Sequence, residues 1–393
     1  MSDPTQRFLS VIDERRDAGQ SIVLRYHAAL ELLPEPTEDT RLKSLLAQTS
    51  IREGLRVFDL CQVAGVQVCM LDETSLMHTG TLKSIDGCVT TAHCLLNGFH
   101  RVVFETGGNT GTALAEYGRR AGIESYCVLP EANLPLLSGS TFDGQLTHLV
   151  AVEDRARLKE VAQTLACRHG LERIPRTAWR YQASMFTGCF LLEQLLTGPG
   201  FDYLVQTVSA GFGPIGIYRV LMEHRPALGV LPRFIGVQQD ANCPMYRAWR
   251  PASAETLDGR TPEVLSAVMY DRDPHSYGTT SELMRLLDET GGWLTLVSLG
   301  EFKRLLGSEE TPWVLDLLHG LGVEVARRDG AIVERTGLIA LAGVLKEIAA
   351  GRIPAGSRVL CCLTSGTWRL QGRALPEERI RGAAPLEKAA LHA

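Results

Sequence analysis

The chain has 393 residues, of which 45% are hydrophobic and 22% are charged, and its formal net charge is −5. This composition is that of an ordinary globular protein, and the negative charge excludes a basic field that would hold nucleic acid or an anionic membrane. At roughly 100–200 residues per domain, the length predicts two domains. No run approaches the ~18 apolar residues of a membrane span, so we expect no transmembrane helix.

The N-terminal stretch and the cysteines together predict a cytoplasmic setting. Residues 1–17, MSDPTQRFLSVIDERRD, lack the apolar core of a secretory signal. The ten cysteines are scattered without a C-x-x-C pair, and Cys361 and Cys362 are adjacent within an apolar run. This pattern is typical of buried thiols in a reducing compartment, so we expect neither disulfides nor a bound metal.

Predicted strands and helices alternate along most of the chain. The first 50 residues are expected to form a polar, helical extension that is broken near Pro34 and Pro36. The runs predicted as strands are 101–107, 125–130, 146–152, 201–210, 232–238 and 357–364. The stretches predicted as helices are 109–122, 153–170, 182–196, 215–226, 280–292, 298–307 and 339–351. Strands separated by helices of this length predict β-α-β crossovers and an α/β fold with open, mostly parallel sheets.

The segment VSAGFGPIGIYR at residues 208–219 contains a G-x-G-x-x-G pattern between a predicted strand and a predicted helix. This spacing occurs in dinucleotide-binding loops, and Asp240 stands near the end of the next strand, where a ribose-binding acid could lie. A structural turn is a second interpretation. The third is a site for a single phosphate monoester, because loop N–H groups and a helix N-terminus attract any phosphate. We favour this third interpretation.

A second stretch, MHTGTLKSIDG at residues 77–87, places Lys83 at the expected start of a helix. A solvated lysine is the simplest interpretation. A cation is disfavoured at a helix N-terminus, however. A lysine that forms a Schiff base must become neutral before its amine attacks an aldehyde, and this position favours the neutral form. Lys83 is therefore a candidate nucleophile.

Two further stretches end predicted strands in small or hydroxylated residues. In ETGGNTGTALAEYGRRAG at residues 105–122, Asn109 or Thr110 could cap a helix, or the glycines before them could form a nest that binds a carboxylate. In RVLCCLTSGTW at residues 358–368, an apolar strand ends at Thr364. This is either a plain exit turn or part of a site, since ligands of open α/β sheets lie beyond the carboxyl ends of strands.

Together and in this order, these stretches resemble the fold-type II pyridoxal-phosphate enzymes, in particular threonine synthase and cysteate synthase. The stretch around Lys83 is similar to the NPTGSFKDR motif of that family, and TGGNTG at 106–111 is similar to its SGNTG loop. SAGFG at 209–213 is similar to its phosphate loop, and LTSGT at 363–367 to its LTGHG. The resemblance covers roughly residues 55–368.

The resemblance implies a site for pyridoxal 5'-phosphate and a role for each matching residue. Lys83 would bind the cofactor aldehyde covalently and later act as the general base on the α-proton of the substrate. Asn109 would bond the phenolic oxygen, and Thr364 would face the pyridine nitrogen. The residues expected to bind the cofactor phosphate are Ser209, Ala210, Gly211, Phe212 and Gly213. The residues expected to bind the substrate carboxylate are Thr106, Gly107, Gly108, Asn109 and Thr110.

Departures from the family motifs bear on the reaction. Ser84 and Ile85 replace the Asp-Arg pair after the lysine, and Ser365 to Trp368 replace a His-Gly-Leu-Lys run. We therefore expect cysteate synthase-like β-elimination or β-replacement on an O-activated amino acid, with O-phospho-L-serine as substrate and sulfite as the small nucleophile. Threonine synthase-type conversion of O-phosphohomoserine is the alternative within the family. Alternatives of other classes are an NAD-dependent oxidoreductase and a non-catalytic homologue that binds the cofactor.

The same resemblance implies two open α/β domains of the tryptophan synthase β-like architecture, with the cofactor in the crevice between them. We expect residues 1–87 and 196–393 to form a large cofactor-binding domain, in which 1–50 is the helical extension. Residues 88–195 would form a small mobile domain that closes over the substrate. The loop 271–278 would lie near the entrance, and the family habit implies a homodimer.

Overall fold

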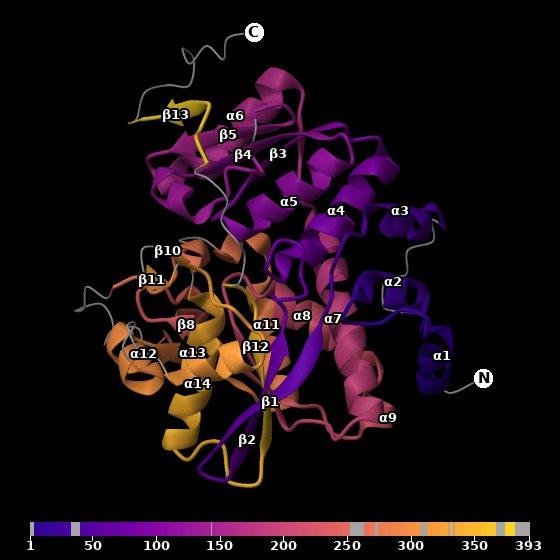
Figure 1. The fold of residues 1–393 in the computed structure, drawn as a ribbon, viewed down its shortest axis with the longest axis vertical. Helices are drawn as coiled ribbons and strands as arrows, with labels where there is room; N and C mark the ends of the chain where they lie inside the picture. Colours follow the sequence, from indigo (N-terminus) through magenta and orange to yellow (C-terminus); the bar gives the residue numbers. More distant parts are fainter. Residues whose placement is uncertain are drawn as a thin grey trace.

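The computed structural model describes residues 4–32, 40–142, 144–251, 263–271, 274–307, 313–328, 331–332, 335–366 and 374–381. These residues form two stacked lobes, each built around a sheet with helices on both faces (Figure 1). Within the described segments, no helix combines the length and the apolar character that a membrane crossing requires. None of the ten cysteines, all of which lie in the described segments, forms a disulfide.

The larger sheet has six strands in the order β1-β2-β12-β7-β8-β9. Its strands are β1 (Arg56–Val63), β2 (Val66–Asp72), β7 (Tyr203–Thr207), β8 (Arg233–Gln239), β9 (Trp293–Val297) and β12 (Arg358–Leu363). β1 pairs with β2 as an antiparallel hairpin, and all other neighbours pair in parallel. The carboxyl ends of the parallel strands therefore meet at one edge of the sheet, the edge that faces the other lobe.

Both faces of the larger sheet are buried, which explains why its strands read as continuous apolar runs. One face packs against α7 (Thr177–Thr197), α8 (Phe212–Glu223) and α11 (Thr280–Thr290). The other face packs against α12 (Leu299–Leu306), α13 (Trp313–Gly320) and α14 (Thr336–Ala349). Successive residues alternate between the two cores, so that Leu204 contributes to the first and Val205 to the second.

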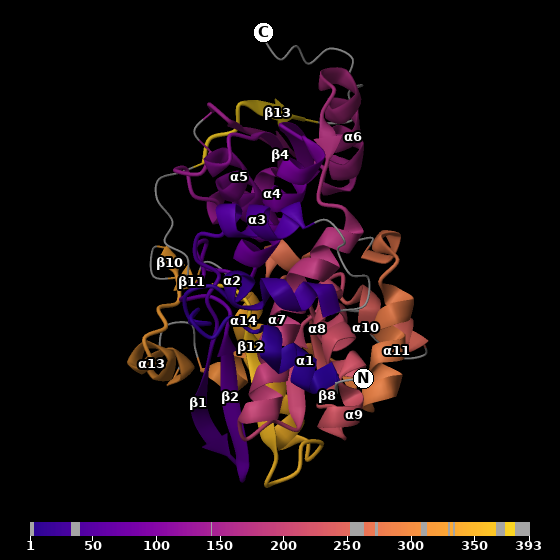
Figure 2. The same cartoon turned by 90° about the vertical axis from the view of Figure 1, so that its right-hand side faces the viewer.

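The smaller sheet has five parallel strands in the order β13-β5-β4-β3-β6. Its strands are β3 (Arg101–Glu105), β4 (Glu124–Pro130), β5 (Thr147–Val152), β6 (Glu172–Arg173) and β13 (Glu378–Ile380). α4 (Lys83–Asn97) and α5 (Asn109–Arg120) cover one face, and α6 (Leu158–His169) covers the other (Figure 2). This arrangement is a second, smaller α/β layer structure with its own core.

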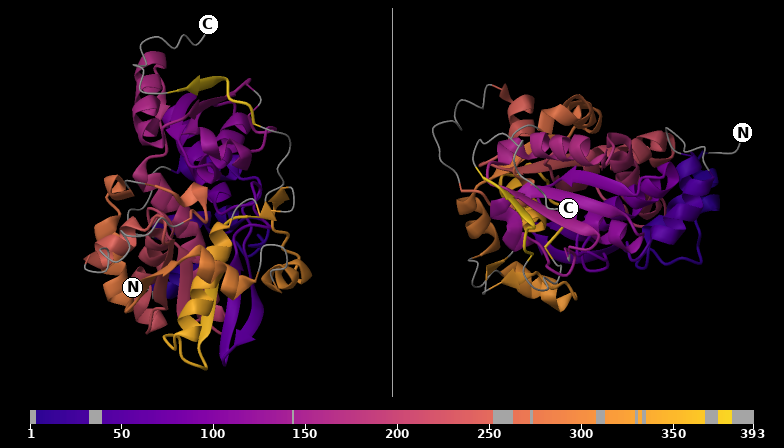
Figure 3. Two further views of the ribbon diagram at one scale, coloured as in Figure 1. Left: turned by 90° about the vertical axis from the view of Figure 1, so that its left-hand side faces the viewer. Right: turned by 90° about the horizontal axis from the view of Figure 1, so that it is seen from above.

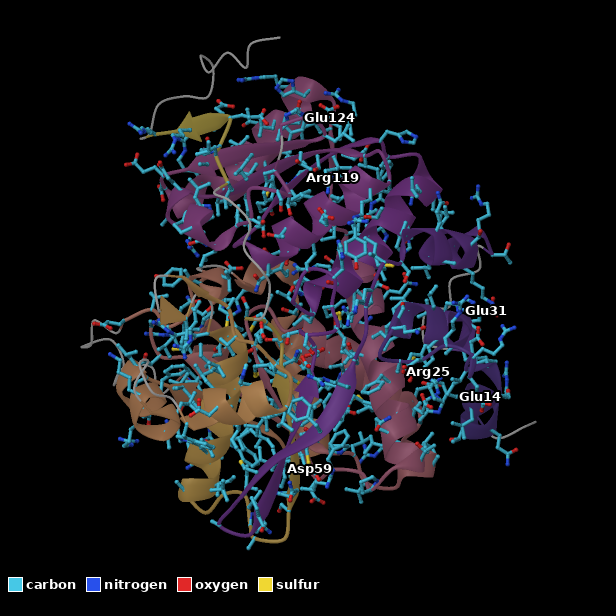
Figure 4. All side chains as sticks on the ribbon, in the orientation of Figure 1. Glu14, Arg25, Glu31, Asp59, Arg119 and Glu124 are labelled. Atoms are coloured by element: carbon cyan, nitrogen blue, oxygen red, sulfur yellow. The ribbon has the colours of Figure 1, made fainter. Side chains whose placement is uncertain are left out.

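The N-terminal extension is attached to the rest of the molecule by buried polar contacts. Its helices are α1 (Pro4–Val11), α2 (Ile22–Tyr26) and α3 (Arg41–Thr49). Arg25, labelled in Figure 4, forms an ion pair with Glu193 of α7 at 2.5 Å. The fully buried Glu53 accepts hydrogen bonds from Ser21 at 2.8 Å and from Tyr117 of α5 at 2.6 Å. The expected break at Pro34 and Pro36 lies outside the described residues.

The predicted α/β class with mostly parallel sheets is confirmed, and each predicted strand and helix is present at its expected place. Two elements cross the expected domain limits. β13, assigned to the larger domain, pairs with β5 of the smaller sheet (Figure 3). α7, assigned mostly to the smaller domain, packs along α8 of the larger one. The reason is that β13 covers an otherwise open sheet edge, while α7 is apolar on most of its surface and is buried between neighbours.

Candidate active site

A cavity of about 620 Å³ lies where the carboxyl ends of strands from both sheets meet. The loops that follow β3, β7 and β12 all contribute to its wall. Every residue assigned to the site from the sequence lines this one cavity: Lys83, Thr106, Gly107, Gly108, Asn109, Thr110, Ser209, Ala210, Gly211, Phe212, Gly213 and Thr364. The fold thus brings four distant stretches together, while the role of each residue stays a prediction.

Lys83 is the first residue of α4 and is held by short local contacts. Its backbone N–H donates to Thr81 Oγ1 at 3.1 Å, and its Nζ donates to Asp86 Oδ2 at 2.9 Å. The lysine side chain is 20% exposed, whereas that of Asp86 is 3% exposed. The amine therefore reaches the cavity while its counter-ion is buried behind it.

The loop after β7 has the geometry of an anion site. Gly211 has a φ of +85°, a conformation that favours glycine, and caps α8, which begins at Phe212. The N–H groups of the first helical turn have no acceptor within the helix, and the helix dipole makes this end positive. The turn lines the cavity, so it can bind a phosphate group there.

The loop after β3 also has a geometry that suits an anion. The Thr106 hydroxyl accepts hydrogen bonds from the N–H groups of Gly108 at 3.0 Å and Gly111 at 2.9 Å, which shapes the turn. A Cβ atom on Gly107 would lie 2.7 Å from the carbonyl oxygen of Val268, so the close approach requires glycine. α5 begins at Asn109, and its first two residues, Asn109 and Thr110, line the cavity with N–H groups that have no acceptor within the helix. A carboxylate fits this end.

Several buried polar atoms around the cavity have no hydrogen-bond partner in the described part of the chain. They are Asn109 Oδ1, Gln206 Oε1, Thr207 Oγ1 and Thr364 Oγ1. Buried polar groups are normally satisfied, and each unsatisfied one costs about 1–3 kcal/mol. Their position on the wall of one cavity indicates a polar ligand that completes them.

The sequence analysis did not identify four cationic side chains on the wall of the cavity. Arg155, Lys159, Arg173 and Arg180 all line the cavity. Arg173 forms an ion pair with Glu105 at 3.0 Å, and Arg155 donates to the carbonyl oxygens of Ala267 and Tyr270. Arginine and lysine side chains are usually solvated, so the sequence offers no signal that would have singled out these residues.

Arg180 differs from the other cations of the cavity. Its guanidinium lies 4.0 Å from the centre of the Phe212 ring and 5.7 Å from that of Tyr277. Its Nε is buried and lacks an acceptor among the residues that the structure describes. Aromatic rings thus hold a positive charge beside the phosphate-type loop, and its Nε–H is available to an acceptor.

Three other stretches named in the sequence analysis differ in where they lie relative to the cavity. Asp240, which a dinucleotide site would need, lines a separate groove beside Trp249 and Trp293 and not this cavity. In the loop 271–278, the described residues Asp271 and Tyr277 line the cavity, as expected for an entrance loop. Residues 367–373, which include the end of the late motif, lie outside the described part of the chain.

Comparisons with known proteins agree with this geometry. The family model described as pyridoxal-phosphate dependent enzyme matches residues 54–305. Threonine synthase of Methanosarcina acetivorans is 22% identical over 313 residues, which cover 78% of this chain and 71% of that protein. Cysteate synthase of Methanosarcina barkeri is 23% identical over 363 residues, which cover 88% and 82%. The family match spans more than half of the chain.

Solved structures of other proteins share the fold. Diaminopropionate ammonia lyase of Escherichia coli superposes with a TM-score of 0.60 at 15% identity, covering 83% of this chain and 88% of that one. The cavity also fits pyridoxal 5'-phosphate: an amine at Lys83, a phosphate-type loop at 209–213, and unsatisfied polar atoms on Asn109 and Thr364 between them. Since the family match and the chemistry of the cavity agree, the chain belongs to the pyridoxal-phosphate dependent enzymes of fold type II.

Proposed function

We propose that this enzyme catalyses β-elimination or β-replacement on an O-phospho amino acid, with O-phospho-L-serine and sulfite giving cysteate and phosphate. In this reaction the bond between the β-carbon and the phosphate oxygen breaks, and a bond from the β-carbon to the sulfite sulfur forms. The proton of hydrogen sulfite ends on the released phosphate. The observation that carries the proposal is Arg180, an arginine on the cavity wall whose buried Nε has no acceptor among the described residues.

Arg180 favours a substrate with a second anionic group. Guanidinium binds phosphate through charge-assisted, often bidentate hydrogen bonds. Phe212 and Tyr277 fix the guanidinium by stacking, so little side-chain freedom is lost when an anion binds. An arginine placed at a leaving phosphate also stabilises the charge that develops as the bond breaks.

The other residues divide the remaining tasks. The bound cofactor supplies an electron sink for the negative charge at the substrate α-carbon. Lys83 moves the α-proton as a general base. The loop 106–110 holds the substrate carboxylate with helix N–H groups. Thr364 presents a neutral hydroxyl, which stabilises a positive ring nitrogen less than a carboxylate would and thereby favours prompt loss of the leaving group.

The two named kinds of relative support this substrate class, and they also set the alternative. Threonine synthase-type conversion of O-phosphohomoserine would use the same cation and the same two anion sites. The replacement of the family Asp-Arg pair by Ser84 and Ile85 favours the cysteate synthase-like reaction. We further propose that the lobe built around the smaller sheet, predicted from the sequence at residues 88–195, moves to close the cavity and exclude water. A homodimer and a cytoplasmic setting stay predictions.

The deciding experiment measures phosphate release by the cofactor-loaded enzyme. O-phospho-L-serine is compared with O-phosphohomoserine, each with and without sulfite, and the products are identified by mass spectrometry. Sulfite-dependent formation of cysteate supports the proposal. Faster turnover of O-phosphohomoserine to threonine would establish the alternative reaction. Cofactor binding without turnover of either compound would identify a non-catalytic homologue.

A further inference from the structure

Two buried carboxyl groups lie behind Lys83, on the side away from the main cavity. Asp86 is 2% exposed and accepts the hydrogen bond from Lys83 Nζ at 2.9 Å. Glu73, which follows β2, is 1% exposed. Glu73, Asp86 and Gln206 line a small cavity of about 10 Å³, which shares Leu82, Gln206 and Gly213 with the wall of the main cavity.

Glu73 has few hydrogen-bond donors around it. Its Oε1 has a long contact of 3.5 Å with Thr187 Oγ1, and its Oε2 has no partner in the described part of the chain. A buried carboxylate without donors is costly, so the protonated form is favoured. Burial raises the pKa of Glu73 to about 8, although the positive charge of Lys83 opposes this rise. Glu73 therefore carries a proton at neutral pH.

The groups that face Glu73 come from three elements. Lys83 and Asp86 belong to α4, Asp72 ends β2, and Cys362 lies on β12. The Asp72 carboxylate forms an ion pair with Arg56 at 2.9 Å and accepts hydrogen bonds from the hydroxyls of Thr74 and Ser75. Burial raises the pKa of the Cys362 thiol, so this group is uncharged. Asp86 and Glu73 are therefore the carboxyl groups near Lys83 that no arginine neutralises.

We propose that Asp86 and Glu73 are positioning residues that set the charge of Lys83. The carboxylate of Asp86 orients the amine through the existing hydrogen bond and, as an adjacent opposite charge, favours its ammonium form. Glu73 keeps its own proton and so adds no second negative charge that would hold the proton on the lysine. The start of α4 acts in the opposite direction, because a helix N-terminus disfavours the cation. The inference rests on Lys83 as the reactive amine of the proposed function but on no particular substrate.

The test measures the pH dependence of Lys83 acetylation by acetic anhydride in the full chain without added cofactor. Only the neutral amine reacts, so the midpoint of the rate profile, read by peptide mass spectrometry, reports the charge of Lys83. Asp86→Asn should move the midpoint down by about 1–3 pH units, because an adjacent opposite charge is lost. Glu73→Gln should match the wild type below a pH of about 8 and react faster above it, where Glu73 of the wild type ionises.

Lys346 is the matched control within the same molecule. It pairs with Glu301 at 2.9 Å, far from Glu73 in the sequence, and its midpoint should be equal in all variants. Asp86→Glu keeps the charge and should restore the wild-type midpoint. An Asp86→Asn midpoint equal to that of the wild type would overturn the role of Asp86. If that variant does not fold, the Glu73→Gln variant provides the test. Acetylation rates of Lys83 above pH 8 that are identical in Glu73→Gln and the wild type would overturn the inference. None of these readouts requires turnover, so they are independent of the substrate proposal.

Discussion

The backbone N–H of Leu82 donates a hydrogen bond to the carbonyl oxygen of Thr364 at 3.0 Å. This bond joins the start of α4 to the end of β12, two segments that lie far apart in the sequence. Gly337 of α14 packs directly behind them, since a Cβ atom there would lie 3.2 Å from Thr364 N. The amine of Lys83 and the hydroxyl of Thr364 are therefore held on one rigid part of the cavity wall.

Replacement of the lysine should abolish covalent attachment of the cofactor. We expect borohydride reduction of the loaded enzyme to trap the cofactor on Lys83, and Lys83→Ala to carry no adduct, because only a neutral primary amine can attack the aldehyde. Peptide mass spectrometry locates the adduct. Lys346→Ala, which changes a lysine outside the cavity, serves as the control. Trapping on any other lysine would refute the site as assigned.

Removal of the Arg180 guanidinium should lower the activity of the enzyme toward phosphorylated substrates. A hydrogen bond to a charged group contributes about 1.5–3 kcal/mol, so Arg180→Gln should lower kcat/KM for O-phospho-L-serine by roughly 10–100-fold. Arg176→Gln is the matched control, since Arg176 stacks on Phe99 and Trp179 at 5.2 Å and does not line the cavity. Steady-state kinetics with O-acetylserine, whose leaving group is uncharged before it departs, should show a smaller loss. Equal losses for both substrates would count against an anion-binding role.

The loop after β3 should not tolerate a side chain at its centre. In Gly107→Ala the new Cβ would lie 2.7 Å from the Val268 carbonyl oxygen, and the shift needed to relieve this contact should cost about 1–3 kcal/mol. We expect a lower midpoint of thermal unfolding and a raised KM for the amino acid. Gly300→Ala is the control, because the nearest atom to its Cβ would be 4.0 Å away. A Gly107→Ala variant with wild-type KM and stability would contradict the described loop geometry.

A carboxylate outside the cavity should make stability depend on acid pH. Burial by itself would raise the pKa of Glu116, but hydrogen bonds from His78, Arg120 and Arg119 outweigh it and lower the pKa to about 2. Because the folded value lies below the unfolded value of 4.5, the stabilisation is present above pH 4.5 and is lost as the pH falls toward 2. Glu116→Gln should cost about 1–3 kcal/mol in urea unfolding at neutral pH, the lower part of this range being expected because both arginines are partly exposed.

The same variant should become equal to the wild type at the acid end. There the wild-type carboxyl is itself protonated, and the difference in the free energy of unfolding should vanish. Glu14→Gln, at an exposed position, is the control and should match the wild type across the range. A difference for Glu116→Gln that stays constant from neutral pH to pH 3 would show that the charge is not what stabilises this contact.

Hydrophobic periodicity was sufficient to predict the buried parallel strands, because strands covered on both faces are continuous apolar runs between helices. It did not reveal the β1–β2 hairpin, where side chains such as Asp59 and Gln62 interrupt the apolar pattern. β13 was also not predicted, since a strand of three residues is too short to show a recognisable hydrophobic periodicity. Its pairing with β5 is a contact between distant segments, and local sequence holds no record of such a contact.

The sequence by itself determined the fold class, the family and the four stretches that form the cavity, because each stretch has a local signature of glycine, hydroxyl and lysine spacing that backbone geometry imposes. Only the tertiary structure determined which charged side chains surround these four stretches. Whether Arg180 is paired, and whether Glu73 and Asp86 lie behind Lys83, depends on the approach of helices from different parts of the chain. Charge and burial act through space, and so the chemistry of this cavity follows from packing that no local motif encodes.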